Sequence, residues 1–161
     1  MDALAIRPMT QDELEVVRDR MIREYAADHV RAGNWSEEEA LTRATAQTDE
    51  LLPDGVHTPG VIWLVAETPE GRRIGHVWVG PQPRPGAKGA WIYAIEVEED
   101  ARGRGYGRAL LEAAEREAAR AGFPSIGLNV FGPNTVARKL YDTAGYEVTS
   151  LQMLKELRPK T

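Results

Sequence analysis

The sequence predicts one mixed α/β domain of the α+β type, with a mostly antiparallel central sheet, one parallel β-α-β unit and helices on both faces. The chain has 161 residues, of which 42% are apolar, a size that suits one ordinary domain with its own core. A strand, a helix and a second strand follow one another over residues 90–131, and such a unit makes its two strands parallel with a right-handed crossover. Short turns between other strands favour antiparallel pairing. We therefore expect residues 1–161 to form a single domain.

Two helices are expected in the first third of the chain, after a short strand within residues 3–9. Thr10 and Glu13 have the spacing of a capping box, and the apolar residues that follow recur at helical intervals until Gly33. Ser36 and Glu39 have the same spacing. They predict a second helix that ends near residue 51.

The rest of the chain alternates between strands and helices. Strands are expected over residues 61–67 and 73–80, and the turn signal Pro69-Glu70-Gly71 between them predicts a hairpin. The β-α-β unit that follows consists of a strand over 90–98, a helix over 105–121 and a strand over 126–131. A helix over 133–144 and a closing hairpin over 146–157 complete the predicted fold.

The strand over residues 90–98 is expected to lie in the centre of the sheet. Simple alternation assigns its residues to two faces, one with Trp91, Tyr93, Ile95 and Val97 and the other with Ile92, Ala94 and Glu96. Both faces are largely apolar. Such a strand is typical of a sheet that is covered on both sides.

Charge and composition exclude several classes of protein. The net charge of −5 argues against nucleic acid or an anionic membrane as the main partner. The longest wholly apolar run covers six residues, 61–66, far fewer than the ~20 that cross a bilayer. The N-terminal residues lack the basic start and apolar stretch of a secretory signal. We therefore expect a cytoplasmic protein with no membrane association.

Neither cysteine nor histidine indicates a metal centre or a thiol nucleophile. The chain has no cysteine, which excludes disulfides, thiolate catalysis and Cys-ligated zinc. His29, His57 and His76 are scattered without the spacing of metal ligands, so we expect them on the surface or in loops and expect no metal site.

A turn rich in glycine and arginine follows the central strand, in the run Arg102-Gly103-Arg104-Gly105-Tyr106-Gly107-Arg108. Its glycines allow backbone amides to approach a ligand, and the helix that begins there contributes unpaired N–H groups and a partial positive charge. The pattern predicts a diphosphate cradle. It differs from a dinucleotide fingerprint, which would need glycine where Arg108 stands, and from a Walker A loop, which would need Gly-Lys-Ser/Thr.

These residues also carry a resemblance to a known family. Arg102-x-x-Gly105-x-Gly107 is similar to the Gln/Arg-x-x-Gly-x-Gly/Ala motif of the GNAT N-acetyltransferase superfamily, and Val97 stands five residues before it. Asn134, seven residues before Tyr141, resembles the second block of that superfamily. The similar region covers about residues 61–155, whereas residues 1–60 match only in coarse layout.

The resemblance implies a role for each part of the predicted site. The backbone of Gly103, Arg104, Gly105, Tyr106, Gly107 and Arg108, with Arg102 at the first motif position, would hold the diphosphate of acetyl-CoA. The pantetheine arm would pair with the strand near Ile95, Glu96 and Val97, and the Val97 N–H would face the thioester carbonyl.

The second block would complete the site. Asn129 and Asn134 would bond acetyl-CoA or shape the gap between the strands, with Ala137 on the same side of the helix as Tyr141. Tyr141 would be the general acid that protonates the leaving thiolate. Its chemistry fits, because a thiolate of pKa ~8.5 benefits from a donor of pKa ~10. The same tyrosine also suits a half-buried packing position against Leu140 and Val136.

The base is left open between Glu96 and a water relay. Deprotonating a lysine-like amine of pKa ~10.4 at pH 7 costs about 4.6 kcal/mol, whereas an α-amine of pKa ~7.7–8.0 costs only about 1 kcal/mol. Glu96 is the best candidate because its apolar neighbours should raise its pKa. Alternatively, Glu96 lies at the end of the strand with its carboxylate facing water and has no catalytic role.

These observations lead to a hypothesis with two alternatives. We expect an enzyme that transfers acetyl from acetyl-CoA to a primary amine of a small molecule or peptide, by direct attack in a ternary complex. Residues 1–60, with a net charge of −7, would form the acceptor side, and residues 61–155 the acyl-CoA-binding core. The alternatives are a non-catalytic acyl-CoA sensor and a nucleotide-binding domain. An exposed strand edge could also pair two copies in a homodimer.

Overall fold

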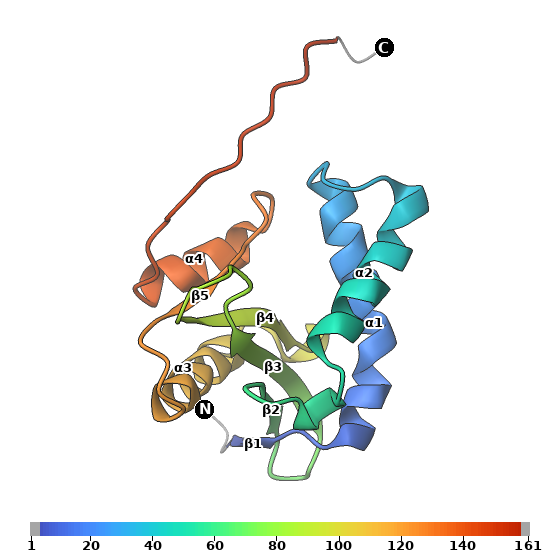
Figure 1. Cartoon of the computed structure of the whole chain (residues 1–161). Coiled ribbons are helices and arrows are strands. Elements are labelled where there is room, and N and C mark those ends of the chain that lie inside the picture. The colour runs from blue at the N-terminus through green and yellow to red at the C-terminus, as the bar shows by residue number, and fades with distance from the viewer. Residues whose placement is uncertain (1–3, 159–161) are drawn as a thin grey trace.

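A five-stranded sheet in the order β1-β2-β3-β4-β5 runs through the computed structural model, which describes residues 4–158 (Figure 1). The four pairings join antiparallel neighbours except for β4 and β5, which are parallel. The predicted mixed sheet is therefore confirmed. The strands are β1 (Ala5–Pro8), β2 (Ile62–Glu67), β3 (Arg73–Pro81), β4 (Ala90–Val97) and β5 (Ile126–Leu128).

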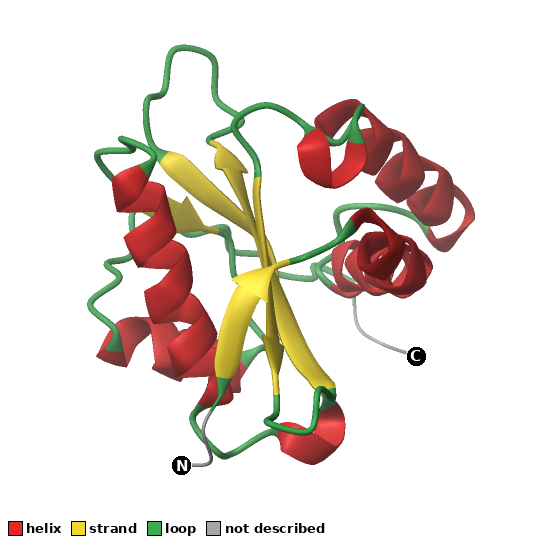
Figure 2. Ribbon diagram, turned by 90° about the horizontal axis from the view of Figure 1, so that it is seen from below, coloured by secondary structure: helices red, strands yellow, loops and turns green. Residues whose placement is uncertain are grey.

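Helices cover both faces of this sheet (Figure 2). On one face, α3 buries Leu110, Leu111 and Ala114 against a core that includes Val77 and Val79 of β3. On the other face, α1 packs against the stacked indoles of β2 and β3, and α2 lies against α1. The helices are α1 (Gln11–Arg31), α2 (Glu37–Leu51), α3 (Tyr106–Arg120) and α4 (Thr135–Thr143), with the short 3-10 turns η1 (Gly55–His57) and η2 (Glu99–Ala101).

The first two helices begin where the sequence predicts. The Thr10 hydroxyl accepts from the Glu13 amide, and the Glu13 carboxylate accepts from the Thr10 amide, so this capping box is complete. The Ser36 hydroxyl accepts from the Glu39 amide at the start of α2. The Glu39 carboxylate pairs with Arg43 one turn later, so the second box is only half formed.

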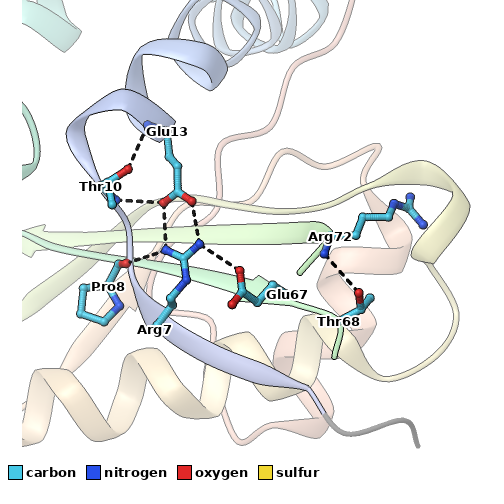
Figure 3. Close-up of polar contacts among 7 residues, drawn as sticks. All are labelled: Arg7, Pro8, Thr10, Glu13, Glu67, Thr68 and Arg72. Atoms are coloured by element: carbon cyan, nitrogen blue, oxygen red, sulfur yellow. Dashed lines mark hydrogen bonds and ion pairs between the residues drawn. The ribbon is translucent and has the colours of Figure 1, made fainter. Parts of the chain in front are cut away.

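An ion cluster joins β1, β2 and the start of α1 (Figure 3). The Arg7 guanidinium donates to Glu13 at 2.7 Å and to Glu67 at 2.9 Å. The hydrogen bond from Arg7 is the main reason why the pKa of Glu13 falls to about 2. Glu13 thus stays ionised in mild acid, which preserves both the capping box and the link between α1 and the sheet edge.

The predicted faces of β4 are wrong beyond Ile92, because a β-bulge interrupts the alternation. Trp78 lies opposite Ala94 and Val79 opposite Ile92, so Tyr93 is an extra residue in β4. Tyr93 stacks on Trp78 and shares the α1 side with Ala94. A bulge places two successive side chains on one face, so every side chain beyond it lies on the face opposite to the one that simple alternation predicts.

Beyond the bulge, the side chains of β4 divide as follows. Ile95 and Val97 pack with Ile92 on the α3 side. Glu96 faces α1, where Arg20 pairs with it. Glu96 therefore shares a face with Ala94, as expected, but not with Ile92.

The end of the chain also differs from expectation. Strand β5 stops at Leu128 rather than Phe131, and residues 147–157 form neither strand nor helix. The expected hairpin over 146–157 is wrong. A hairpin needs a turn, and this stretch contains no glycine, proline, asparagine or aspartate to favour one.

Gly75 is required by the close approach of β3, β4 and α3. A Cβ at this position would lie 2.6 Å from the Glu96 carbonyl oxygen and 2.9 Å from Leu110 Cδ1. Since the nearer atom belongs to the backbone, Gly75→Ala should lower the free energy of unfolding by about 1–3 kcal/mol. Urea unfolding followed by tryptophan fluorescence measures this change. In Gly132→Ala the new methyl meets nothing within 4 Å, so an equal loss in that control would contradict the assignment.

Candidate active site

The two parallel strands separate soon after they meet. Only Ala90–Ile92 of β4 pair with Ile126–Leu128 of β5. From the bulge at Tyr93 to Val97, the β5-facing edge of β4 has no strand partner among residues 4–158. Bulges bend a strand and end its pairing, so the bulge accounts for the divergence. The separation leaves a stretch of strand edge beside the predicted positions Ile95, Glu96 and Val97.

The turn after β4 leads directly to the start of α3. Gly103 and Gly105 have φ values of +78° and +83°, a backbone conformation that residues other than glycine rarely adopt. Thr10, Ser36 and Asn134 cap the other three α-helices with a side-chain oxygen, whereas α3 has no such cap within the described chain. The N-terminus of α3 is therefore open to an external acceptor.

Six consecutive backbone amides, from Gly103 to Arg108, donate to no acceptor within residues 4–158. Amides at a helix N-terminus need such partners, and anions satisfy them well. The Tyr106 side chain is buried in the α3 core, so only its backbone faces the turn. The turn therefore offers several unpaired amide donors side by side, and its role as a diphosphate cradle stays a prediction.

The three arginines of the turn have different surroundings. Arg102 Nε donates to the Val97 carbonyl oxygen at 2.9 Å, which ties the turn to the end of β4. Arg108 donates to Thr143 of α4 at 2.5 Å. Arg104 is exposed and lines a depression of about 390 Å³ beside the β2–β3 turn. Arg102 and Arg108 thus tie the turn to the end of β4 and to α4.

The residues predicted on the β5 side lie around the start of α4. Asn129 follows β5 and is exposed, whereas Ala137 is half-buried. The Asn134 side-chain oxygen accepts from the Ala137 amide at 3.2 Å and so caps α4. Asn134 also lines a hollow of about 240 Å³ between the end of α1 and the β5–α4 connection. This contact brings the first helices next to the β5 side of the site.

Tyr141 packs against the α3 side of the core together with Ile95 and Val97. Its ring centroid lies 5.8 Å from that of Tyr146. The Tyr146 hydroxyl bonds to Glu115, whereas the Tyr141 hydroxyl has no hydrogen-bond partner within the described part of the chain. Burial raises the pKa of Tyr141, which keeps its hydroxyl protonated at neutral pH.

Glu96 lies on the opposite face of β4, within a cluster of charged residues. Arg20 of α1 approaches it at 3.3 Å and also pairs with Glu98 at 3.0 Å. Burial raises the pKa of Glu96, nearby Glu24 adds to the rise, and Arg20 opposes it. The predicted acid and base therefore flank β4 from its two faces.

His76 is a feature of the site that the sequence did not reveal. It was expected at the surface, yet it lies in β3 opposite Glu96 and is only 3% exposed. Its Nε2 has no hydrogen-bond partner among residues 4–158 and lies 3.8 Å from a Glu96 carboxylate oxygen. Burial, aided by Arg20, lowers the pKa of His76 to about 4. A neutral imidazole therefore lies behind the Glu96 carboxylate at neutral pH.

An aromatic cluster lies between the first two helices and the β5–α4 connection. Trp35 stacks on His29 at 3.9 Å, and Tyr25 meets both rings edge-on. His29 in turn contacts Phe131 at 5.1 Å. Trp35 therefore has a packing role in this group.

Neither a metal-ligand cluster nor a membrane-spanning helix is present in residues 4–158. No three His, Asp or Glu side chains within residues 4–158 converge as metal ligands. The helices in that range lack the length and apolar character needed to span a bilayer.

The buried His76 predicts a loss of stability in acid. Between pH 6.5 and about 4, the unfolded chain takes up a proton at His76 that the folded chain does not, so stability falls as the pH falls. The pKa shift corresponds to about 3 kcal/mol. His76→Gln should remove this part of the decline, as measured by urea unfolding at pH 7 and pH 4. Parallel declines in both proteins would contradict the assignment.

Comparison with known proteins identifies the family. Residues 19–146 match the acetyltransferase (GNAT) family. The uncharacterized N-acetyltransferases YycN and YdgE of Bacillus subtilis (strain 168) are 30% and 28% identical to this chain, each over 96% of it and 99% of the relative. The crystal structure of YycN has a TM-score of 0.86 and 30% identity, and covers 98% of this chain and 100% of its own.

A solved acetyl transferase from Pyrococcus furiosus has a TM-score of 0.68 and 29% identity, over 96% of this chain and 100% of its own. Acetyl-CoA is the co-substrate of the family. The chain therefore belongs to the GNAT acetyltransferase family and is an acyltransferase.

Proposed function

We propose that this protein transfers the acetyl group of acetyl-CoA to a primary amine by direct attack in a ternary complex. The observation that carries the proposal is the row of six amides without acceptors, from Gly103 to Arg108, beside an unpaired edge of β4. The amides would hold the diphosphate of acetyl-CoA, with the guanidinium groups of the turn adding positive charge. The pantetheine arm would then lie along Ile95, Glu96 and Val97 as an added strand.

The reaction uses groups on both faces of β4. The amine nitrogen attacks the thioester carbonyl carbon, whose oxygen accepts a hydrogen bond from the Val97 N–H. A C–N bond forms and the C–S bond breaks. The departing thiolate takes a proton from the Tyr141 hydroxyl, and the ammonium proton passes to Glu96, directly or through water.

The first 60 residues supply the acceptor side in this proposal. They hold 13 acidic and 6 basic residues, a net charge of −7, which favours the approach of a cationic amine. Glu24 and Glu98 lie near Glu96 on the same side of the sheet as α1. Arg20 holds this cluster together, and its charge limits repulsion between the carboxylates.

The experiment that tests the proposal follows thiol release from acetyl-CoA with a panel of primary amines, including polyamines, amino acids and peptide N-termini. The proposal requires acetyl-CoA consumption that depends on an amine, with a mass increase of one acetyl group on that amine. Tight CoA binding without turnover across the panel would favour the non-catalytic sensor instead. Displacement of CoA by ATP in a thermal-shift assay would favour a nucleotide site.

Tyr141→Phe tests the general acid. Removing the hydroxyl should lower kcat by at least about 100-fold, because the thiolate then leaves without a positioned proton donor. CoA affinity, measured by calorimetry, should change less than twofold. Tyr146→Phe is the matched control, since it removes the hydroxyl of the neighbouring ring that bonds to Glu115. Unchanged turnover in Tyr141→Phe would show that another group protonates the thiolate.

Glu96→Gln tests the base. With a lysine-like acceptor, kcat/KM at pH 7 should fall at least about tenfold. The acidic limb of the pH profile of kcat/KM should also change. The effect should shrink with an α-amine, which is easier to deprotonate. Glu98→Gln removes the other carboxylate that pairs with Arg20, and should raise KM for the amine while keeping the pH profile. Identical pH profiles for Glu96→Gln and the unmodified enzyme would leave the water relay as the base.

A further inference from the structure

His76 is a buried polar side chain to which the proposed reaction gives no role. It lies in β3 between Val65 of β2 and Glu96 of β4. Its ring centroid is 6.2 Å from that of the Trp63 indole, so both residues that β2 places beside it are uncharged. Its Nε2 atom is buried without a hydrogen-bond partner in the described chain. Such atoms cost free energy and are rare in native proteins, so the surroundings of Nε2 indicate which proton it is placed to meet.

The Glu96 carboxyl lies between two different nitrogen groups. An Arg20 guanidinium nitrogen is 3.3 Å from Oε1 of Glu96, and His76 Nε2 is 3.8 Å from Oε2. The guanidinium can only donate, so it stabilises the ionised carboxylate. An imidazole nitrogen that carries no proton can only accept, so it bonds to the carboxyl only when that group is protonated. Glu96 therefore has one partner for each of its protonation states.

The separation of 3.8 Å between Nε2 and the carboxylate oxygen agrees with this arrangement. An ionised carboxylate and an imidazole nitrogen without a proton are both acceptors, so no hydrogen bond draws them together. An N–H group at Nε2 would instead donate to the carboxylate, and charge-assisted bonds of that kind close to about 2.7–2.9 Å. We therefore assign the proton of the neutral ring to Nδ1, which leaves the lone pair of Nε2 facing Glu96.

Charged groups from α1, from the end of β4 and from the glycine turn act on Glu96. Burial is the main reason why the pKa of Glu96 lies above its ordinary value. Glu24 of α1 and Glu98, which follows β4, add to the rise. Arg20 of α1 and Arg102 of the turn oppose it. The balance makes the carboxyl easier to protonate than an exposed one.

The same surroundings keep a proton off His76. Burial is the main reason why its pKa falls to about 4. Arg20 of α1 and Arg73 of β3 lower the pKa further, and Glu98 opposes them. A proton that reaches the pair therefore stays on Glu96, and the imidazole remains a neutral acceptor.

We propose that His76 is a positioning residue for the base, and that its Nε2 accepts a hydrogen bond from the Glu96 carboxyl after this group has taken the proton of the amine. The inference rests on the function proposed above. An N–H bond of the ammonium group breaks and an O–H bond forms on Glu96. Rotation about the Cγ–Cδ bond, a broad torsion in glutamate, then turns the O–H group toward Nε2. The proton passes to water after the acetylated amine departs, so His76 ends each cycle unchanged.

The pKa of Glu96 in the resting protein tests this contact without any turnover. The carboxyl carbon chemical shift reports it during a pH titration of the unmodified protein and of His76→Leu. Loss of the acceptor should lower the pKa of Glu96 by about one unit, because the protonated form loses a hydrogen bond. A merely structural role predicts the opposite sign, since leucine makes the surroundings of the carboxyl less polar and so raises its pKa. An unchanged or raised pKa would overturn the proposal.

Val65→Ala is the matched control for this titration. Val65 is buried beside His76 on β2, two strands away from Glu96, so its truncation loosens the same part of the core and should leave the pKa of Glu96 unchanged. An equal fall in this control would assign the effect to packing and overturn the proposal. The ring nitrogen chemical shifts of His76 at pH 7 should show a proton on Nδ1 alone. A proton on Nε2 would make the ring a donor and would equally overturn it.

The pH profile of kcat/KM with a lysine-like amine tests the role of His76 in the reaction. The acidic limb of this profile reports the pKa of the base in the free enzyme, so in His76→Leu the limb should move to lower pH by about one unit. At pH 7, kcat/KM should fall about threefold to tenfold, because a weaker base takes the proton. In a Glu96→Gln background the same substitution should have no further effect, since His76 acts through the carboxyl.

The outcomes separate this inference from the proposed function. An active enzyme whose acidic limb stays in place in His76→Leu would overturn the positioning role and leave the proposed function intact. A further loss of kcat/KM when His76→Leu is added to Glu96→Gln would also overturn it. An unmodified protein that acetylates no amine would overturn the proposed function and this role with it, whatever the titration of Glu96 shows.

Discussion

The divergence of β4 from β5 is the constraint on which the rest of the site depends. Parallel pairing over Ala90–Ile92 holds the two strands together at one end. The extra residue at Tyr93 then bends β4 and turns its remaining backbone edge toward a gap rather than a neighbour. The same strand runs into η2 and the glycine turn, so the open edge and the uncapped N-terminus of α3 follow one another along the chain.

The bulge also determines which groups reach the gap from each face. It sends Ile95 and Val97 to the side of α3 and Tyr141, and it leaves Glu96 with α1 and Arg20. In the proposed reaction, the thiolate and its proton donor belong to the first side and the amine to the second. In that proposal, the bulge in β4 places the proton donor for the thiolate and the base for the amine on opposite faces of the strand.

Local signals in the sequence predicted much of the fold, including the turn that precedes α3. The caps at Thr10 and Ser36, the hairpin between β2 and β3 and the glycine turn each depend on a few adjacent residues. The bulge could not be predicted, because both faces of β4 are largely apolar and the bulge leaves its single charged side chain, Glu96, on the same face as Ala94. His76 was misjudged because β3 is covered on both faces, which hides a lone polar residue. The hairpin expected over residues 146–157 was wrong because this stretch contains no glycine, proline, asparagine or aspartate to form its turn.

The measurement that tests the account most directly is the backbone amide spectrum of the protein during titration with CoA. The account predicts that the resonances of residues 103–108 shift together as CoA binds. Pantetheine, which lacks the diphosphate, should leave them in place. Saturation with CoA that shifts other amides while those of the turn stay unchanged would contradict the central claim that the uncapped start of α3 holds the phosphates.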